Sequence, residues 1–284
     1  MRMRKRNISL AVAIAILLAL VAWTVWGNTA LEQNAYTIES NHLPKSFDGY
    51  RIAHISDLHN AEMGKNNEKL LSMLRNAQPD MIAITGDLID SRNTNISIAL
   101  QFAKEAVRIA PCYYVTGNHE SRVSDYDKLK SGLLELGVVI LENEKMEIHR
   151  NEERITVFGV NDPSFKTGYI LGDAVSVMNH SLQQLEGEEN FTVLLSHRPE
   201  LMDVYAEHGV DLVLSGHAHG GQFRLPLLGG VFAPNQGMFP KYDSGLFERE
   251  NTKMIVSRGI GNSIIPLRFN NRPEMILVEL RAAG

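Results

Sequence analysis

The chain has 284 residues, of which 44% are hydrophobic and 21% charged, the proportions of an ordinary globular protein. The formal net charge of −5 does not favour nucleic-acid binding, which needs a basic face, and we expect no nucleic-acid partner. The single cysteine, Cys112, cannot form an intramolecular disulfide. Cysteine usage therefore does not indicate whether the protein resides in an oxidising or a reducing compartment. Cys112 lies in an apolar run, which favours a buried structural thiol.

The N-terminus combines a basic flank with a long apolar run. Four basic residues precede Ile8–Trp26, which carries no charge and has about the length that a helix needs to cross a bilayer. We therefore expect residues 1–27 to be a single-pass anchor in the cell membrane. The basic flank favours the cytoplasmic side, which places the rest of the chain outside the cytoplasm.

Two alternatives remain for this run. A cleaved signal peptide has a similar pattern, although no good small-x-small cleavage site follows here. A buried helix of a soluble protein fits less well, because the run is apolar on all sides and follows a basic cluster.

Residues 28–48 are polar and lack strong periodicity, which predicts a linker, and residues 49–284 then form one domain. Strand-like and helical patterns alternate at its start, as expected for parallel strands with helical crossovers in an α/β fold. The expected strands are 50–57, 80–87, 112–118, 154–160, 191–197, 211–217, 253–259 and 273–280, and the expected helices are 67–77, 96–107 and 125–136.

Five of the expected strands end in polar side chains that can bind metals. In an open α/β sheet the carboxyl ends of the strands line the binding crevice, so these residues should converge. Mixed carboxylate, imidazole and amide ligands suit Mn²⁺, Zn²⁺ or Fe²⁺ better than Ca²⁺ or Mg²⁺. There are more of them than one tetrahedral ion needs, which predicts two divalent ions. The residues are Asp57, His59, Asp87, Asn118, His119, His197, His217 and His219.

The motifs "ISDLH", "TGDLID", "TGNHE", "LSHRP" and "SGHAHGGQ" occur in this order and resemble the calcineurin-like metallophosphoesterase superfamily. The resemblance covers nearly everything from Arg51 to Leu280. The tail "SRGIGNSIIPLRFNNRPEMILVEL" further resembles the bacterial membrane-associated branch. The resemblance implies a four-layer α/β/β/α sandwich with central mixed sheets, here preceded by one transmembrane helix.

The resemblance also implies two sets of metal ligands that share one residue. The first ion would be held by Asp57, His59 and His219, the second by Asn118, His197 and His217, and Asp87 would bridge the two. Because glycines flank His217 and His219, we expect a loop in which each ring reaches its own ion.

The same resemblance gives His119 a role in catalysis instead of metal binding. It would stand beside the leaving-group oxygen as a general acid or as a stabilising positive charge. Asp90 would hydrogen-bond His119 and keep it protonated, although a helix N-cap is the alternative for Asp90. The phosphatase branch has an arginine directly after this aspartate, whereas here Ser91 intervenes before Arg92, so we do not expect Arg92 to contact phosphate.

These assignments predict a metallophosphoesterase that hydrolyses a phosphoester or pyrophosphate by in-line attack of a metal-bridging hydroxide. Phe223–Glu250 is rich in glycine, proline and apolar residues and either faces a lipid or covers the core. Related enzymes hydrolyse UDP-2,3-diacylglucosamine, which makes a lipid-linked or cell-envelope substrate attractive by analogy.

The alternative is a membrane-anchored scaffold that binds metal without catalysis. A metallopeptidase would need an H-E-x-x-H helix, and the sequence contains none. The oligomeric state stays open.

Overall fold

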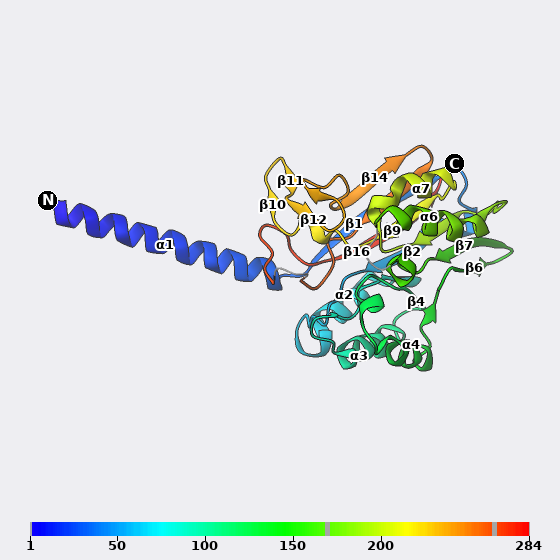
Figure 1. Cartoon of the computed structure of the whole chain (residues 1–284), viewed down its shortest axis with the longest axis horizontal. Coiled ribbons are helices and arrows are strands. Elements are labelled where there is room, and N and C mark those ends of the chain that lie inside the picture. The colour runs from blue at the N-terminus through cyan, green and yellow to red at the C-terminus, as the bar shows by residue number, and fades with distance from the viewer. Residues whose placement is uncertain (1, 168–170, 263–265, 284) are drawn as a thin grey trace.

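The computed structural model describes residues 2–167, 171–262 and 266–283. A long N-terminal helix projects from an α/β domain in which helices cover two sheets (Figure 1). The α-helices are α1 (Arg2–Thr29), α2 (Glu68–Ala77), α3 (Ile96–Ala106), α4 (Tyr126–Glu135), α5 (Ser164–Thr167), α6 (Leu171–Leu182) and α7 (Met202–Glu207). Short 3-10 turns lie at Lys45–Phe47, Lys65–Asn67, Glu120–Arg122, Gln183–Leu185, Pro199–Leu201 and His219–Gly221.

The first sheet has the strand order β1-β16-β2-β3-β4-β5. Its strands are β1 (Glu32–Ser40), β2 (Arg51–Ile55), β3 (Met81–Thr85), β4 (Cys112–Val115), β5 (Val139–Ile140) and β16 (Glu274–Ala282). Strands β2 to β5 run parallel, β16 is antiparallel to β2, and β1 is parallel to β16.

The second sheet has the order β14-β15-β9-β8-β7-β6. Its strands are β6 (Glu144–Arg150), β7 (Glu153–Gly159), β8 (Thr192–Leu195), β9 (Leu212–Ser215), β14 (Gly245–Arg249) and β15 (Thr252–Val256). The four central strands are parallel and the two edge strands antiparallel to their neighbours. Both sheets are therefore mixed.

Alternating side chains of the central strands pack into different layers, because successive residues of a strand point to opposite faces. Met81 and Ala83 of β3 pack between the sheets, whereas Ile82 and Ile84 pack under α2, α3 and α4. A third apolar cluster joins the second sheet to α6 and α7. The predicted four-layer α/β/β/α sandwich is confirmed, because α2, α3 and α4 pack on the outer face of the first sheet and α6 and α7 on the outer face of the second.

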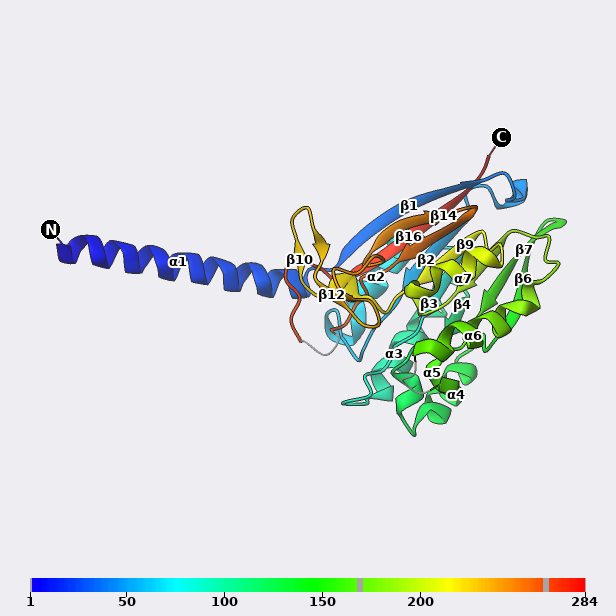
Figure 2. The same ribbon diagram turned by 45° about the horizontal axis from the view of Figure 1, so that its top comes forward.

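Two small hairpins follow β9 and stand beside the end of α1 in both views of the ribbon (Figures 1 and 2). They consist of β10 (Arg224–Leu225) with β11 (Gly229–Gly230), and β12 (Phe232–Ala233) with β13 (Gly237–Met238). These strands lie in the glycine- and proline-rich segment of the sequence analysis.

The expectation of a linker over residues 28–48 is wrong for its central part. Residues Glu32–Ser40 form β1, which pairs in register with the whole of β16 at the edge of the first sheet. The hydrophobic pattern of residues 32–40 is weak because an edge strand buries few side chains. Of β1 only Ile38 is fully buried, in the layer between the sheets.

The N-terminal helix has the length and composition of a membrane span. Leu10–Thr29 has a mean hydropathy of 2.4, and only 6% of its most apolar window is buried. A core helix of a soluble protein would be mostly buried, so that alternative does not fit this structure. A signal sequence meets the same criteria of length and hydropathy as an anchor.

We predict that Ile38→Ala lowers the free energy of unfolding by about 2–5 kcal/mol, because it removes buried methyl groups and leaves a cavity. The matched control is Thr37→Ala on the exposed face of the same strand, which should change stability little. Chemical unfolding of both variants measures the difference. Equal stabilities for the two would mean that residues 32–40 do not pack against the domain.

Candidate active site

The predicted polar residues follow the carboxyl ends of five strands that belong to both sheets. Asp57 and His59 follow β2, Asp87 follows β3, Asn118 and His119 follow β4, His197 follows β8, and His217 and His219 follow β9. Strands β3, β8 and β9 contact one another where the two sheets face each other. The side chains therefore gather at one edge of the sandwich, and each of these eight residues is at most 7% exposed.

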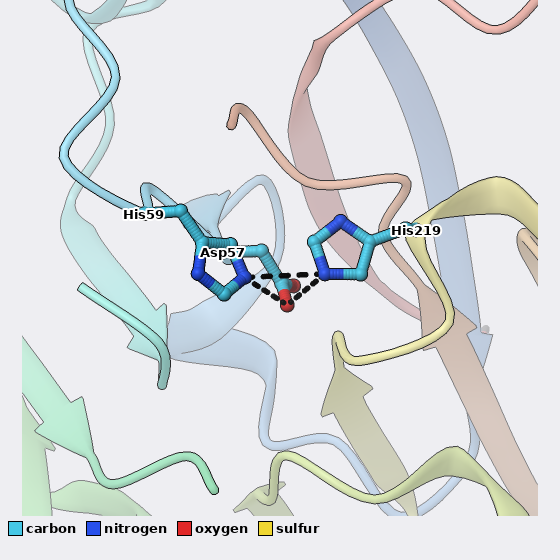
Figure 3. A group of neighbouring side chains, drawn as sticks. All are labelled: Asp57, His59 and His219. Carbon is cyan, nitrogen blue, oxygen red and sulfur yellow. Dashed lines mark hydrogen bonds and ion pairs between the residues drawn. The ribbon is translucent and has the colours of Figure 1, made fainter. Parts of the chain in front are cut away.

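The first cluster contains Asp57, His59 and His219 (Figure 3). The Nε2 atoms of His59 and His219 lie 3.2 Å apart. Asp57 Oδ1 lies 3.2 Å from Nε2 of His219 and 3.7 Å from Nε2 of His59. Figure 3 shows the carboxylate of Asp57 between the two rings.

The second cluster contains Asp87, His197 and His217. Asp87 Oδ2 lies 3.2 Å from Nε2 of His197, which is itself 3.2 Å from Nδ1 of His217. The same Asp87 oxygen lies 3.5 Å from Nε2 of His59 in the first cluster. Asp87 therefore touches both clusters, and the two neighbouring histidines His217 and His219 belong to different ones.

These residues fit two metal ions by the chemistry of their donor atoms. Ligands on one tetrahedral ion with bonds near 2.1 Å are roughly 3.4 Å apart, close to the spacings seen here. Buried oxygens of Asp57 and Asn118 have no hydrogen-bond partner within the chain, which is costly unless a cation binds them. His197 Nδ1 lies 2.7 Å from the Thr85 carbonyl, which directs Nε2 into the cluster, as in many metal sites.

The electrostatics of the clusters also favour cations. Burial raises the pKa of Asp57 and of Asp87, but the surrounding imidazoles outweigh it and hold both pKa values well below their usual range. Burial and the nearby Arg198 lower the pKa of His217, which favours the neutral ring that can coordinate a metal. Two buried carboxylates thus stay ionised beside the imidazole rings of the clusters.

The loops that carry the clusters have unusual backbone conformations. Asp57, His59, Asp87, His217 and His219 all have positive φ angles, between 45° and 67°. This region is sparsely populated by residues other than glycine, and such strain concentrates at functional sites.

Two glycines beside these loops allow their close approach. A Cβ atom at Gly117 would lie 2.2 Å from Asp87 Oδ1, and one at Gly216 would lie 2.4 Å from Asp57 Oδ2. No larger residue fits at either position without moving the carboxylates.

His119 lies against His59, with ring centroids 4.5 Å apart, but Asp90 does not hydrogen-bond it as expected. Asp90 Oδ1 lies 3.7 Å from His119 Nδ1, beyond hydrogen-bond distance, and the Asp90 carboxylate pairs with Arg92 instead. The Ser91 amide donates to Nδ1 at 3.0 Å. Because Nδ1 accepts this hydrogen, the proton of the neutral ring is on Nε2.

The expectation that Asp90 keeps His119 protonated is therefore wrong in this structure. Burial lowers the pKa of His119 to about 4, which agrees with a neutral ring. The Arg92 guanidinium donates to the Asp90 carboxylate at 2.5 Å.

Arg198, in the "LSHRP" motif, is a buried residue of the site that the sequence reasoning missed. Its guanidinium makes a bidentate pair with Asp162, with distances of 2.5 and 2.8 Å, and its Nη1 lies 3.2 Å from Nε2 of His217. The pair fixes the loop after β7 against the second cluster. The signal in the sequence was the charged residue directly after His197.

The Glu120 carboxylate, which follows His119 in the chain, binds backbone amides. It accepts hydrogen bonds from the amides of Gly117 at 2.8 Å, Asp87 at 2.9 Å and Ile89 at 3.3 Å. Burial and the Asp87 charge raise its pKa to about 7. Glu120 thus ties the loop after β3 to the loop after β4.

Histidines outside the motifs stay outside the clusters. His54 is buried in β2 and contacts Thr85 Oγ1 at 2.8 Å. His42, His149 and His180 are exposed, and His208 is half-buried beside Asn179.

A small cavity of about 70 Å³ opens onto both clusters. Its wall includes His119, the exposed Arg122, and Pro234 and Asn235 between β12 and β13. A larger cavity of about 490 Å³ lies near the end of β1 and is lined by none of the cluster residues. The chemistry of the side chains, and not cavity size, therefore locates the site.

The sequence profile of the calcineurin-like phosphoesterase family matches residues 50–221, more than half of the chain. The chain belongs to this family, whose members are metal-dependent phosphohydrolases. The matched segment holds all the residues of the two clusters.

Individual relatives agree with this assignment. "Phosphodiesterase YaeI" of Escherichia coli is 28% identical over 81% of this chain and 82% of its own length. A bovine "Transmembrane protein with metallophosphoesterase domain" is 29% identical over 99% of this chain and 64% of its own length. The structure of TT1561 from Thermus thermophilus is similar in fold, with a TM-score of 0.52, 14% identity, and coverage of 75% of this chain and 90% of that one.

We predict that Asp87→Asn loses both metal ions and about 10²-fold or more in activity, because one oxygen of its carboxylate lies 3.2 Å from His197 and 3.5 Å from His59, one ring in each cluster. Metal content per chain is measured by mass spectrometry after gel filtration. Asp90→Asn, the matched control with the same chemical change, should keep both ions. Two ions retained in Asp87→Asn would contradict a shared ligand.

Proposed function

We propose that the protein hydrolyses a phosphoester or pyrophosphate with two divalent ions held by the seven predicted ligands. The observation that carries the proposal is the pair of buried clusters that meet at Asp87. When bound, the ions would activate water and neutralise charge on the phosphoryl oxygens. Asp57, His59 and His219 are proposed for the first ion, and Asn118, His197 and His217 for the second.

His119 is proposed to act on the leaving group and not as a metal ligand. Its Nδ1 is occupied by the Ser91 amide, and its ring lines the cavity beside Asn118. A neutral ring with its proton on Nε2 is a hydrogen-bond donor for a developing negative charge. Asp90 then contributes only at longer range, through its charge and its pairing with Arg92.

For the substrate we propose a phosphoester or pyrophosphate of the cell envelope, joined to a lipid. The apolar N-terminal helix favours an enzyme held at a membrane, and the name of the E. coli relative favours a diester linkage. The test is a panel of a phosphomonoester, a phosphodiester and UDP-2,3-diacylglucosamine with full-length protein in detergent. Chelation should abolish activity, and restoring Mn²⁺, Zn²⁺ or Fe²⁺ one at a time identifies the effective metal.

A non-catalytic, membrane-anchored scaffold is the second candidate. It predicts metal binding without hydrolysis of any panel member. All seven expected ligand positions hold the expected residue types. This favours the enzyme, because a scaffold does not need a complete set of ligands for two ions.

We predict that His119→Ala keeps both metals but loses about 10²–10³-fold in rate on an alkyl phosphoester, as when one hydrogen-bond donor to a developing charge is removed. The loss should be much smaller on a nitrophenyl ester, whose leaving group needs little stabilisation. His217→Ala should instead lose metal and lose activity on both esters alike. Loss of metal from His119→Ala, with equal loss on both esters, would show that this residue is a ligand.

We also predict that the domain lies outside the cytoplasm, held by α1. Protease added to intact spheroplasts should then degrade the domain without lysis, while a cytoplasmic marker enzyme stays intact. N-terminal sequencing of the purified protein should find the anchor uncleaved. Protection until lysis would reverse the orientation, and a mature chain that starts beyond Ala30 would identify a signal peptide.

A further inference from the structure

The two small hairpins after β9 expose an unusual number of large apolar side chains. No charged residue occurs from Leu225 to Pro240. Most of the exposed large apolar side chains outside α1, among the residues described, lie in these hairpins or in the adjoining Leu267. We call the following residues the apolar hairpin face: Leu225, Leu227, Leu228, Phe232, Met238 and Phe239.

Two residues of this face occupy backbone positions that suit glycine or asparagine better. Leu225–Leu228 is a turn closed by the Leu228 amide and the Leu225 carbonyl, with Leu227 at φ 69° and its side chain fully exposed. Phe239 has φ 54° and is 55% exposed. Neither side chain stabilises the fold through burial, so a partner outside the chain explains them better.

The hairpins are tied to the end of α1 by a continuous set of hydrogen bonds. The Asn28 side chain accepts from the Arg268 amide and donates to the Arg268 carbonyl, both at 2.8 Å. The Gln222 amide group donates to the Leu267 carbonyl at 2.6 Å, and the Arg224 amide donates to the Phe269 carbonyl at 3.0 Å. The segment 266–269 therefore links α1 to the start of the first hairpin.

The same end of α1 has the features of a membrane interface. Trp23 and Trp26 are exposed, and their ring centroids lie 5.1 Å apart. The Cζ atom of Arg272 lies over the Trp26 ring, 4.8 Å from its centroid. Tryptophan favours the headgroup region of a bilayer. The hairpins stand beside this end of α1 in both ribbon views (Figures 1 and 2).

We propose that the apolar hairpin face inserts into the lipid surface of the bilayer that α1 crosses. The proposal rests on the membrane-spanning role of α1 in the proposed function, and it commits to lipid as the occupant because the face continues the surface of the anchor. The exposed Lys241 at the end of the uncharged segment adds attraction for anionic headgroups.

This docking bears on the class of substrate. Pro234 and Asn235 lie between β12 and β13 and form part of the cavity wall, while Phe232 and Met238 of the same hairpin belong to the apolar face. The mouth of the cavity then lies at the membrane surface. The substrate is an amphiphile whose phosphoester group lies at headgroup depth and whose acyl chains remain in the bilayer.

Fluorescence quenching in vesicles tests the docking without any measurement of activity. Full-length Leu227→Cys is labelled with an environment-sensitive dye, inserted into phosphatidylglycerol-containing vesicles, and compared with labelled Leu134→Cys. Leu134 is also an exposed leucine but lies on α4, far from α1, and the native Cys112 is buried. The dye at 227 should be quenched by brominated lipid and shielded from iodide, and the dye at 134 should behave in the opposite way.

Two results would overturn the docking proposal. Equal access of iodide to both dyes means that the hairpins lie in water. Shielding of the dye at 227 from iodide without quenching by brominated lipid means that protein, such as a second copy of the chain, covers the face.

The activity test uses Leu227→Asp with Leu228→Asp, and Leu134→Asp as the matched control. The double variant should lose at least 10-fold on a lipid phosphoester in vesicles and keep its rate on a soluble nitrophenyl ester, while the control changes neither. Equal loss on both substrates contradicts the role in substrate access. If the wild type hydrolyses neither substrate, the proposed function fails, and the quenching result still decides the docking.

Discussion

Asp87 makes the contact that joins the two halves of the site, and its position depends on much of the fold. It follows β3 of the first sheet, and its carboxylate reaches His197 of the second sheet and His59 of the first. It also accepts a hydrogen bond from the His119 amide at 2.8 Å. The two sheets must therefore pack with β3 against β8 for one carboxylate to serve both clusters.

Holding so many ionisable groups together requires compensation from the surrounding backbone. The Glu120 carboxylate accepts hydrogen bonds from three backbone amides in the loops after β3 and β4. Glycines allow those loops to approach without steric conflict. The positive φ angles of the ligand positions are maintained by this surrounding network. The chain itself thus holds the site together, and Asp57 Oδ1 and Asn118 Oδ1 are buried there without a hydrogen-bond partner within the chain.

The C-terminal end of α1 is connected to the site by the segment that follows β15. Arg268 is fully buried; its guanidinium binds the carbonyls of Arg258 and Gly261, while its backbone pairs with Asn28 of α1. The Gly261 amide in turn donates to the Asp57 carbonyl at 2.7 Å. The end of α1, the hairpins and the first cluster are therefore connected through one network of hydrogen bonds.

The sequence by itself determined the class of fold and which strand ends carry the proposed ligands. Buried central strands are continuous apolar runs, and polar residues directly after them have few structural roles, so their spacing carries a strong signal. The long apolar run of α1 is equally clear, because its length and composition need no tertiary context. The identity of the seven proposed ligands also required no structure, since each lies in a short motif.

Only the tertiary structure decided the features that depend on neighbours distant in the chain. The strand β1 is recognisable by its pairing with β16, because an edge strand with one buried residue has almost no hydrophobic pattern. The partner of His119 is the Ser91 amide and not Asp90, and a backbone donor has no signature in the sequence. The pairing of Arg198 with Asp162, and the exposure of Leu227 beside α1, likewise depend on how separate loops pack together.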